Sequence, residues 1–491
     1  MRSSSIAILV LLVATLTAIL WPSRAAFSGK TTVNFTVWGM PFEDRLFRDV
    51  YAREWERLNP GLSINYQRYN DALLMKYNAW HVRGRGSEVM RLRVTDYHGM
   101  VERGMLEPLD GYNDPGGVDL ASRARGYPLW VNGHVYAVPE DNAQFGMFIN
   151  LDIVEEYNRA HPDEKVIIPS QRPGREPIDA TWSNGPSWNE WTWEHLRRAA
   201  RVLTERDSSG RVTRAGLDFT VWSWPFMSFF AQAGGHLWWD GLTCTIDSEA
   251  GVEALEFMRA LQREDRSFVP NLSGFLSGTG PDVLFAAGKT AILLDGSWRV
   301  PTMERVAPDL NFCVVPVPRG KRRAVVSGCV CWGISSKAVH KDEGARMIGY
   351  LTDTPQALAY WDMLRVAPPA SSQAMLAPEF RSTRGVRDAD GTVVVPAMTP
   401  ELYEKRAAWL LYGVEGQEGK EPPPSFIPTG PYQTELEEEI QRMLNRYLNP
   451  DNQETAREVL SEVVRNVHAV IDRDRVARGL PPVQRPQSPG R

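Results

Sequence analysis

The stretch that decides the fold is VNFTVWGMPFEDRLFRDVYAREWERLNPGLSINY, residues Val33–Tyr66. Its first part, Val33–Trp38, alternates and is rich in β-branched and aromatic residues, which predicts a β-strand. Glu43–Leu58 predicts a helix, because apolar residues recur at helical spacing until Asn59–Gly61 ends the pattern. Leu62–Tyr66 predicts a second strand. A strand, a helix and a strand in this order indicate an α/β fold with helices on the faces of a parallel sheet.

The end of the first strand is a candidate ligand position. In open α/β sheets, ligands bind beyond the carboxyl ends of the strands, which is where Trp38 would lie. The chain holds 17 Trp among 491 residues. A surplus of indoles can fill a core, but it also suits stacking against the apolar faces of sugar rings.

Further segments continue the alternation of strands and helices. Asn132–Gly133 between apolar segments predicts a hairpin, and Ser187 with Glu190 predicts a capping box for a helix. The sequence predicts strands at Val135–Pro139, Phe145–Asn150 and Cys329–Ser335, and helices at Trp191–Thr204, Asp247–Gln262, Asp342–Leu351, Thr354–Leu364, Thr434–Leu448 and Asn452–Asp472. Segments rich in Pro, Gly and charge predict a surface insertion at 160–190, a linker at 415–431 and a tail at 481–491.

The N-terminus, residues 1–26, predicts export. A basic start at Met1–Ser5 leads into the apolar run Ile6–Leu20, and small residues at Ser23 and Ala25 suit cleavage after Ala25 or Ala26. The alternative is an uncleaved N-terminal anchor. Either way, we expect the protein in the periplasm or at the outer face of the cytoplasmic membrane.

The net charge and the absence of certain motifs argue against several functional classes of protein. The formal net charge of −5 offers no broad basic surface for nucleic acid. Gly288–Thr290 ends like a P-loop, but Val283 stands where that motif needs its first glycine, so a glycine after a helix is the better interpretation. The sequence has no G-x-S-x-G and no H-E-x-x-H, and we expect neither metal nor cofactor.

The four cysteines, Cys244, Cys313, Cys329 and Cys331, lack the paired spacing of a zinc site. Cys329 and Cys331 alternate along one predicted strand, so they point to one face and are poorly placed to bond each other. Two alternatives remain open, a disulfide between Cys313 and one of them, or buried free thiols.

From about Thr32 to Leu460 the chain resembles the extracellular solute-binding proteins of family 1, the maltose-binding-protein-like receptors of carbohydrate importers. The segments that carry the resemblance, in the family's order, include TVNFTVWGM, TDYHGMVERGMLEPLD, GHVYAVPEDNAQFGMFINLDIVEE, PSWNEWTWEHLRRAARVLT, WPFMSFFAQAGGHLW and FAAGKTAILLDGSWRV. The 160–190 insertion and a longer 365–430 region depart from the family pattern.

The resemblance implies a two-lobed periplasmic-binding-protein fold with a ligand cleft between the lobes. By position, the chain would cross between lobes near Pro139, near 326–328 and near Pro368. The N-lobe would then comprise 31–139 plus 329–368, and the C-lobe 140–327 plus 369–480. The implied function is capture of a carbohydrate by hinge closure, as a monomer, for an ABC permease and its ATPase.

The resemblance also implies the ligand-binding residues. The N-lobe would contribute Trp38 and Asp96, and the C-lobe a set made up of Glu140, Asn142, Trp222, Trp224, Gly235 and Trp298, followed by Arg365 after the last N-lobe helix. Structural ion pairs are an equally good interpretation for Asp96, Glu140 and Arg365. We expect Trp332 and Trp361 in the core, and Trp182, Trp188, Trp191 and Trp193 beside the insertion.

Two alternatives to sugar capture remain. A secreted carbohydrate-active enzyme would use Glu140 and Asp96 as its paired carboxylates. A receptor of the same fold would bind a different solute, such as a polyamine, a metal chelate or a sugar phosphate.

Overall fold

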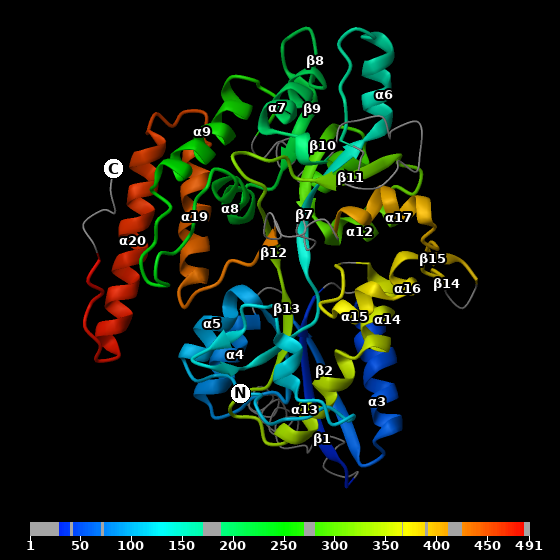
Figure 1. Cartoon of the computed structure of the whole chain (residues 1–491), viewed down its shortest axis with the longest axis vertical. Coiled ribbons are helices and arrows are strands. Elements are labelled where there is room, and N and C mark those ends of the chain that lie inside the picture. Colours follow the sequence, from blue (N-terminus) through cyan, green and yellow to red (C-terminus); the bar gives the residue numbers. More distant parts are fainter. Residues whose placement is uncertain are drawn as a thin grey trace, which may run out of the picture.

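The computed structural model describes residues 29–39, 43–69, 73–169, 188–269, 280–365, 367–387, 391–410 and 425–485. The predicted export segment, Trp182, Ser187, most of the insertion and linker, and the end of the tail lie outside these residues. The described chain forms two α/β lobes stacked along the long axis of the molecule (Figure 1), each built around its own sheet. The predicted α/β class is therefore confirmed.

The first sheet has the strand order β2-β1-β3-β13-β6. Its strands are β1 (Thr31–Trp38), β2 (Leu62–Tyr69), β3 (Val89–Arg93), β6 (Ala137–Pro139) and β13 (Val330–Gly333). β1 pairs in parallel with β2 and β3, whereas β13 is antiparallel to β3 and β6. Between β1 and β2 the chain stays helical through α2 (Asp44–Leu46), η3 (Phe47–Ala52) and α3 (Arg53–Leu58). The predicted strand–helix–strand opening is confirmed.

The core of this first lobe explains why β1 alternates. Phe35 is buried and packs against Phe47 at 6.1 Å and against Trp332 at 5.5 Å between ring centroids. Trp332 is fully buried, as predicted. The lobe is completed by helices and short elements around the sheet: α4 (Leu73–Val82), α5 (Val94–Glu102), η4 (Leu120–Ala124), β4 (Trp130–Val131), β5 (His134–Val135), α13 (Lys341–Leu351) and α14 (Thr354–Leu364).

The predicted hairpin is present between β4 and β5. Asn132 and Gly133 both have positive φ, 52° and 84°, which the two central residues of this tight turn require.

The second sheet has the order β16-β12-β7-β10-β9-β8, and β11 also pairs with β7. Its strands are β7 (Ala143–Asn150), β8 (Glu205–Arg206), β9 (Val212–Phe219), β10 (Thr290–Gly296), β11 (Phe312–Pro316), β12 (Val325–Gly328) and β16 (Ser425–Phe426). Every residue of β7 is buried, as expected for a central strand. β9 and β10 run in parallel, so their carboxyl ends meet at one edge of the sheet.

Helices cover the second sheet: η5 (Trp188–Glu190), α6 (Leu151–Ala160), α7 (Trp193–Val202), α8 (Ser223–Gln232), α9 (Glu249–Arg263), α11 (Pro281–Ala286), η6 (Ser297–Arg299) and α12 (Val300–Val306). The predicted capping box is wrong in position, because Thr192 and His195 cap α7. Thr192 is the last extended residue before the helix, so its side chain reaches the free backbone amide of His195. Gly288 follows α11 with φ of 66°, which confirms a helix-terminating glycine.

The chain passes from the first sheet to the second between β6 and β7, and returns between β12 and β13 (Figure 1). A third segment, residues 367–369, lies beside these two connections. Asn142 donates its backbone N–H to Pro368 O at 2.9 Å, and Glu140 donates to Val330 O at 2.8 Å. After this segment come α15 (Ser372–Leu376), α16 (Pro378–Arg381), β14 (Val386–Arg387), β15 (Val393–Val395) and α17 (Pro400–Arg406).

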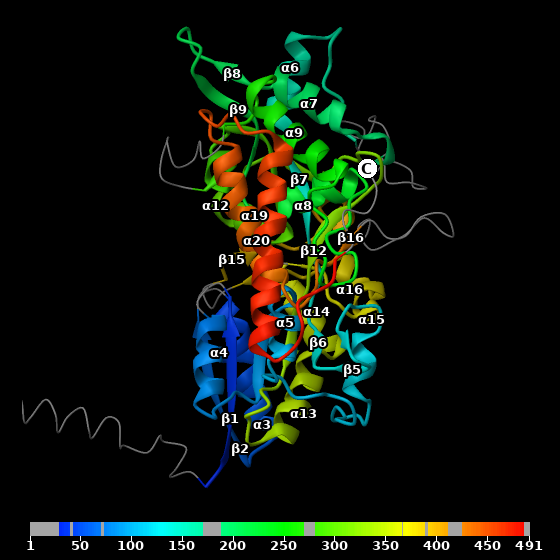
Figure 2. The ribbon, with the colours of Figure 1, turned by 90° about the vertical axis from the view of Figure 1, so that its left-hand side faces the viewer.

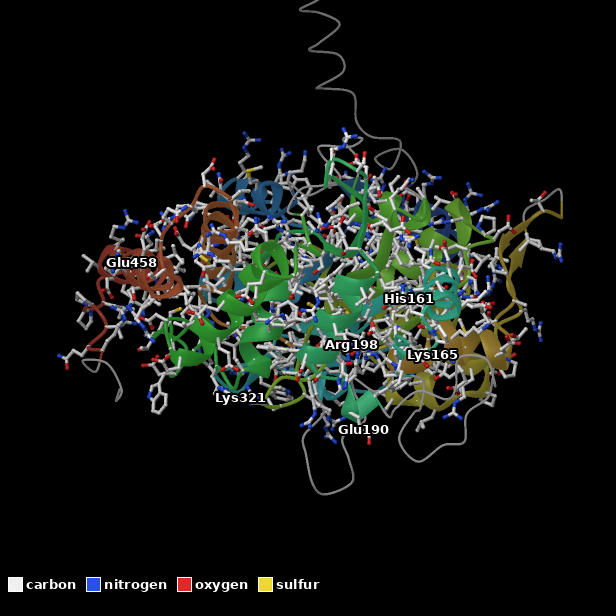
Figure 3. The ribbon with its side chains drawn as sticks, turned by 90° about the horizontal axis from the view of Figure 1, so that it is seen from above. His161, Lys165, Glu190, Arg198, Lys321 and Glu458 are labelled. Atoms are coloured by element: carbon white, nitrogen blue, oxygen red, sulfur yellow. The ribbon has the colours of Figure 1, made fainter. Side chains whose placement is uncertain are left out.

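The C-terminal hairpin of α19 (Gln433–Tyr447) and α20 (Ala456–Ala477) packs beside α8 and α9. It extends past the second sheet to the level of α5 in the first lobe (Figure 2). Seen from above, Glu458 marks α20 at one side of the molecule and His161, at the end of α6, lies toward the other (Figure 3).

All four cysteines are buried free thiols, so of the two alternatives the free thiols are confirmed and a disulfide to Cys313 is not formed. The physical reason is topological. Cys313 lies in β11 of the second sheet, whereas Cys331 lies in β13 of the first sheet and Cys329 in the connection between the two sheets.

Candidate functional site

Three indoles form a wall at the junction of the two sheets. Trp222, Trp224 and Trp298 each lie 5.7 Å, between ring centroids, from the buried Phe145 of β7. Trp222 and Trp224 are stacked at 5.5 Å with planes 20° apart. Trp298 stands across them at 6.1 Å from Trp224. We call Trp222, Trp224 and Trp298 the aromatic wall, and all of them are partly exposed.

Local structure explains how these indoles come together. Trp222 and Trp224 flank the first residue of α8, just after β9, while Trp298 follows the end of β10 in η6. Because β9 and β10 are parallel neighbours, both segments leave the same edge of the sheet. This is the edge where open α/β sheets bind ligands. Trp298 follows the apolar run Ala291–Leu294 and the pair Gly296–Ser297, which predicts that it emerges at a strand end, and the structure confirms this position. Its contact with ligand stays a prediction.

Two glycines make room for the wall. A Cβ placed on Gly296 would lie 2.1 Å from the Trp298 indole, and one placed on Gly328 would lie 2.3 Å from the Trp224 indole. Gly328 is the last residue of β12, where the chain leaves the second sheet. The wall therefore reaches the connection between the lobes.

The first lobe places Trp38 and Asp96, both expected at the site, beside Arg91 and Arg93. Trp38, Arg91, Arg93 and Asp96 line a cavity of about 20 Å³. The Trp38 indole N–H is buried without a hydrogen-bond partner among the described residues. Asp96 accepts from Arg93 Nε at 2.8 Å and from Thr434 Oγ1 at 3.2 Å. Asp96 is thus held in an ion pair and also contacts a helix of the other lobe.

Glu140 belongs to a buried charge cluster around Arg91. The guanidinium donates to Glu43 and to Glu140, both at 2.8 Å. Asp141 accepts from Val330 N at 3.1 Å and from Tyr360 Oη at 3.2 Å. Burial raises the pKa of Glu140 and of Asp141, and the neighbouring carboxylates add to the rise, while the charge of Arg91 acts in the opposite direction. The cluster ties β3 to the segment that joins the two sheets.

The remaining expected residues do not join the wall. Gly235 lies past the far end of α8, where a Cβ would meet the Phe230 ring at 2.2 Å, so its lack of a side chain serves packing. Arg365 is buried with φ of 48° and donates to Thr383 Oγ1 at 2.7 Å. Arg365 also pairs with Glu304 at 3.6 Å, which fits the structural interpretation. Asn142 is buried, and its Oδ1 has no partner among the described residues.

Among the other tryptophans, Trp361 is buried, as predicted, and donates to Phe380 O at 2.8 Å. Trp188 and Trp191 are buried in the second lobe, and Trp193 stacks on Phe257 at 4.2 Å. These four residues build the core and do not face the wall.

Sequence reasoning missed Glu437 and Gln433 of α19. Gln433 donates to Glu437 Oε1 at 3.1 Å. Burial raises the pKa of Glu437 to about 7, although hydrogen bonds from Gln433 and Trp224 and the positive charge of Arg93 act in the opposite direction. Glu437 is therefore close to Trp224 of the aromatic wall and to the charges of Arg93 and Asp96. The only signal in the sequence is their four-residue spacing on one helix face.

A larger cavity of about 910 Å³ is bordered mostly by the first lobe, at Trp55, Arg125 and Arg346, and on one side by Gln373 of α15. None of the expected site residues lines it. In the described parts of the chain, no group of three or more His, Cys, Asp or Glu could hold a metal ion. None of the described helices is long and apolar enough to span a membrane.

Several solved structures share this fold. An ABC substrate-binding protein from Listeria monocytogenes, in complex with cycloalternan, has 17% identity and a TM-score of 0.68 over 92% of this chain and 100% of its own. The GacH receptor of Streptomyces glaucescens, solved unliganded and with acarbose, has 18% identity and a TM-score of 0.66 over 90% of this chain and 98% of its own. MalE from Bdellovibrio bacteriovorus, bound to maltotriose, has 15% identity and a TM-score of 0.64 over 88% of this chain and 99% of its own.

No curated protein matches the sequence. Residues 43–358 match the family described as bacterial extracellular solute-binding protein. The matched segment covers more than half of the 491 residues, and its fold is the two-lobed one seen in the solved structures. This chain therefore belongs to the bacterial extracellular solute-binding proteins.

Proposed function

We propose that this protein is an exported receptor that captures a sugar or oligosaccharide between its lobes and delivers it to an ABC importer. The observation that carries the proposal is the aromatic wall at the junction of the lobes. Indole faces stack against the apolar faces of pyranose rings, and carboxylates and amides bind the hydroxyl groups. The structural relatives named above were solved with cycloalternan, acarbose and maltotriose, which supports a carbohydrate ligand.

The proposed contact residues come from both lobes. The second lobe contributes the aromatic wall, and the first contributes Trp38 and Asp96. Glu437 of α19 is added because Trp224 bonds to its carboxyl and the charges of Arg93 and Asp96 act on it. A site divided in this way requires the lobes to approach each other around the ligand, by rotation about the segments that connect them.

The proposed lobes follow the boundaries expected from the sequence, 31–139 plus 329–368 and 140–327 plus 369–480. The hydrogen bonds of Glu140 and Asn142 with Val330 and Pro368 bring three connecting segments together and support this division. The receptor would act as a monomer and present both lobes to the permease, while the ATPase acts from the other side of the membrane.

Asp96 and Glu140 fit a role in binding better than a role as the catalytic pair of a glycosidase. An acid–base pair for glycoside hydrolysis needs two carboxyl groups that face one glycosidic bond. Here Asp96 pairs with Arg93 and Glu140 pairs with Arg91, each at 2.8 Å. Both groups are thereby committed to separate guanidinium partners.

A ligand panel tests the proposal. The sugar arm of the panel holds maltose, maltotriose, acarbose, cycloalternan and tagatose. At least one of these sugars should raise the melting temperature in a thermal-shift assay, because a ligand that binds the native state stabilises it. Calorimetric titration should then show saturable binding of the same sugar. Putrescine, a ferric chelate and glucose 6-phosphate serve as the non-sugar arm. Binding only in that arm would contradict the sugar assignment, and sugar products released on incubation would contradict a binding role.

A further inference from the structure

The C-terminal hairpin, α19 and α20, touches the first lobe although it packs on the second. Thr434 Oγ1 donates to Asp96 Oδ1 at 3.2 Å and lies 3.3 Å from Thr95 O. Thr95 and Asp96 belong to the first turn of α5. The same hairpin also packs on α8 and α9 of the second lobe.

Two ion pairs extend this contact along α5. Arg103, just past the end of α5, pairs with Glu435 at 3.3 Å. Glu102 pairs with Arg478, just past the end of α20, at 3.0 Å. Both ion pairs are partly exposed, so each alone is weak. They act together with the hydrogen bonds of Thr434, because all of these contacts join α5 to the same C-terminal hairpin.

A glycine allows the two lobes to approach here. A Cβ placed on Gly99 of α5 would lie 3.3 Å from Pro431 O, two residues before α19 begins. Glycine in the middle of a helix lowers its stability relative to other residues, so a packing reason at this position is significant. In Figure 2, α20 runs beside the first lobe at the level of α5.

We propose that the C-terminal hairpin is a clasp that holds the two lobes together in the absence of ligand. The contact of Thr434, Glu435 and Arg478 with α5 lies outside the connecting segments Glu140–Asn142, Cys329 and 367–369, so rotation of the lobes must break or shift it. Because Thr434 and Glu437 stand one turn apart on α19, the helix that bonds to Asp96 also carries the carboxyl beside Trp224. The inference rests on the lobe movement proposed above, but on no particular ligand.

The experiment measures the distance between the lobes in the ligand-free protein. Spin labels on Met75→Cys in α4 and Val306→Cys in α12 report on one lobe each, since the two native side chains are 70% and 63% exposed. The native thiols are buried, so labelling is selective. The test variants are Thr434→Val, the triple variant T434V/E435Q/R478Q, and the wedge Gly99→Leu.

Double electron–electron resonance should show one narrow distance distribution for the parent protein and a second, shifted population in the triple variant and in Gly99→Leu. The matched control is Arg446→Gln, which removes the pair with Glu462 at 2.9 Å inside the hairpin and leaves α5 untouched. It should keep the parent distribution.

An unshifted distribution in both the triple variant and Gly99→Leu, with melting curves that show folded protein, would overturn the clasp. If the triple variant does not fold, Thr434→Val and Gly99→Leu decide the result, because each changes a single, partly exposed residue. No sugar is present in this measurement, so failure of the panel to identify a sugar would leave its outcome unaffected.

Discussion

Gly328 and Trp224 are in direct contact, because the Trp224 indole covers the Cα of Gly328. A Cβ placed on Gly328 would lie 2.3 Å from Cη2 of Trp224. The wall of the candidate cleft thus rests on the residue at which β12 ends and the chain leaves the second sheet. We expect Gly328→Ala to displace the indole and to destabilise the fold by roughly 1–3 kcal/mol, as overpacking does. Chemical unfolding and near-ultraviolet circular dichroism measure the two effects. Gly61→Ala is the control, because open space surrounds that position.

Trp298→Ala separates ligand contact from structural support. Trp298 is partly exposed, and we expect its loss to weaken binding of the panel sugar at least about tenfold, roughly 1.4 kcal/mol, with a melting temperature within a few degrees of the parent. Trp361→Ala is the contrasting core variant and should cost about 3–5 kcal/mol of stability. A large loss of stability in Trp298→Ala with unchanged affinity would assign Trp298 to the core.

The charge cluster predicts strong destabilisation by Arg91→Met. This variant leaves Glu43, Glu140 and Asp141 buried without their guanidinium partner, which should cost about 3–5 kcal/mol. Urea unfolding measures the effect. Arg48→Met removes an exposed pair with Asp49 and should leave the stability almost unchanged, because solvent screens the pair. Equal effects of the two variants would show that the cluster is not a stabilising element.

Asp218 predicts a pH dependence of stability. Burial raises the pKa of this β9 carboxyl to about 7, and the neighbouring charge of Asp295 adds to the rise. The folded state therefore keeps a proton that the unfolded state loses near pH 4. The resulting contribution to stability is fully present below pH 4, falls as pH rises from about 4 to about 7, and is absent above that range.

Asp218→Asn should remove this contribution. The difference in unfolding free energy between Asp218→Asn and the parent should therefore shift in favour of the variant between pH 4 and pH 7, by up to about 1.4 kcal/mol per pH unit. Urea unfolding at pH 4.5, 6 and 7.5 measures it, with the exposed Asp163→Asn as control. A constant difference across the three pH values would contradict the raised pKa.

Local sequence was sufficient to predict the elements whose signals lie within a few residues. The strand–helix–strand opening follows from the change of hydrophobic period between Val33 and Tyr66, and the Asn132–Gly133 turn follows from its backbone preference. The position of Trp298 at the end of a strand follows from the apolar run before it. Burial of Trp332 and Trp361 was also predicted, since each stands inside a regular apolar pattern.

Contacts between distant segments determined the rest. The partners of Arg91 lie 48 and 49 residues away, and Thr434 meets Asp96 across 338 residues. No periodic signal encodes such pairs, so Arg365 could be interpreted as a ligand contact until its buried pairing with Glu304 was visible. The free thiols have the same explanation, because Cys313 and Cys331 belong to different sheets. Hydrophobic patterning specifies which face of an element is buried, but only packing specifies which side chains from other elements it meets.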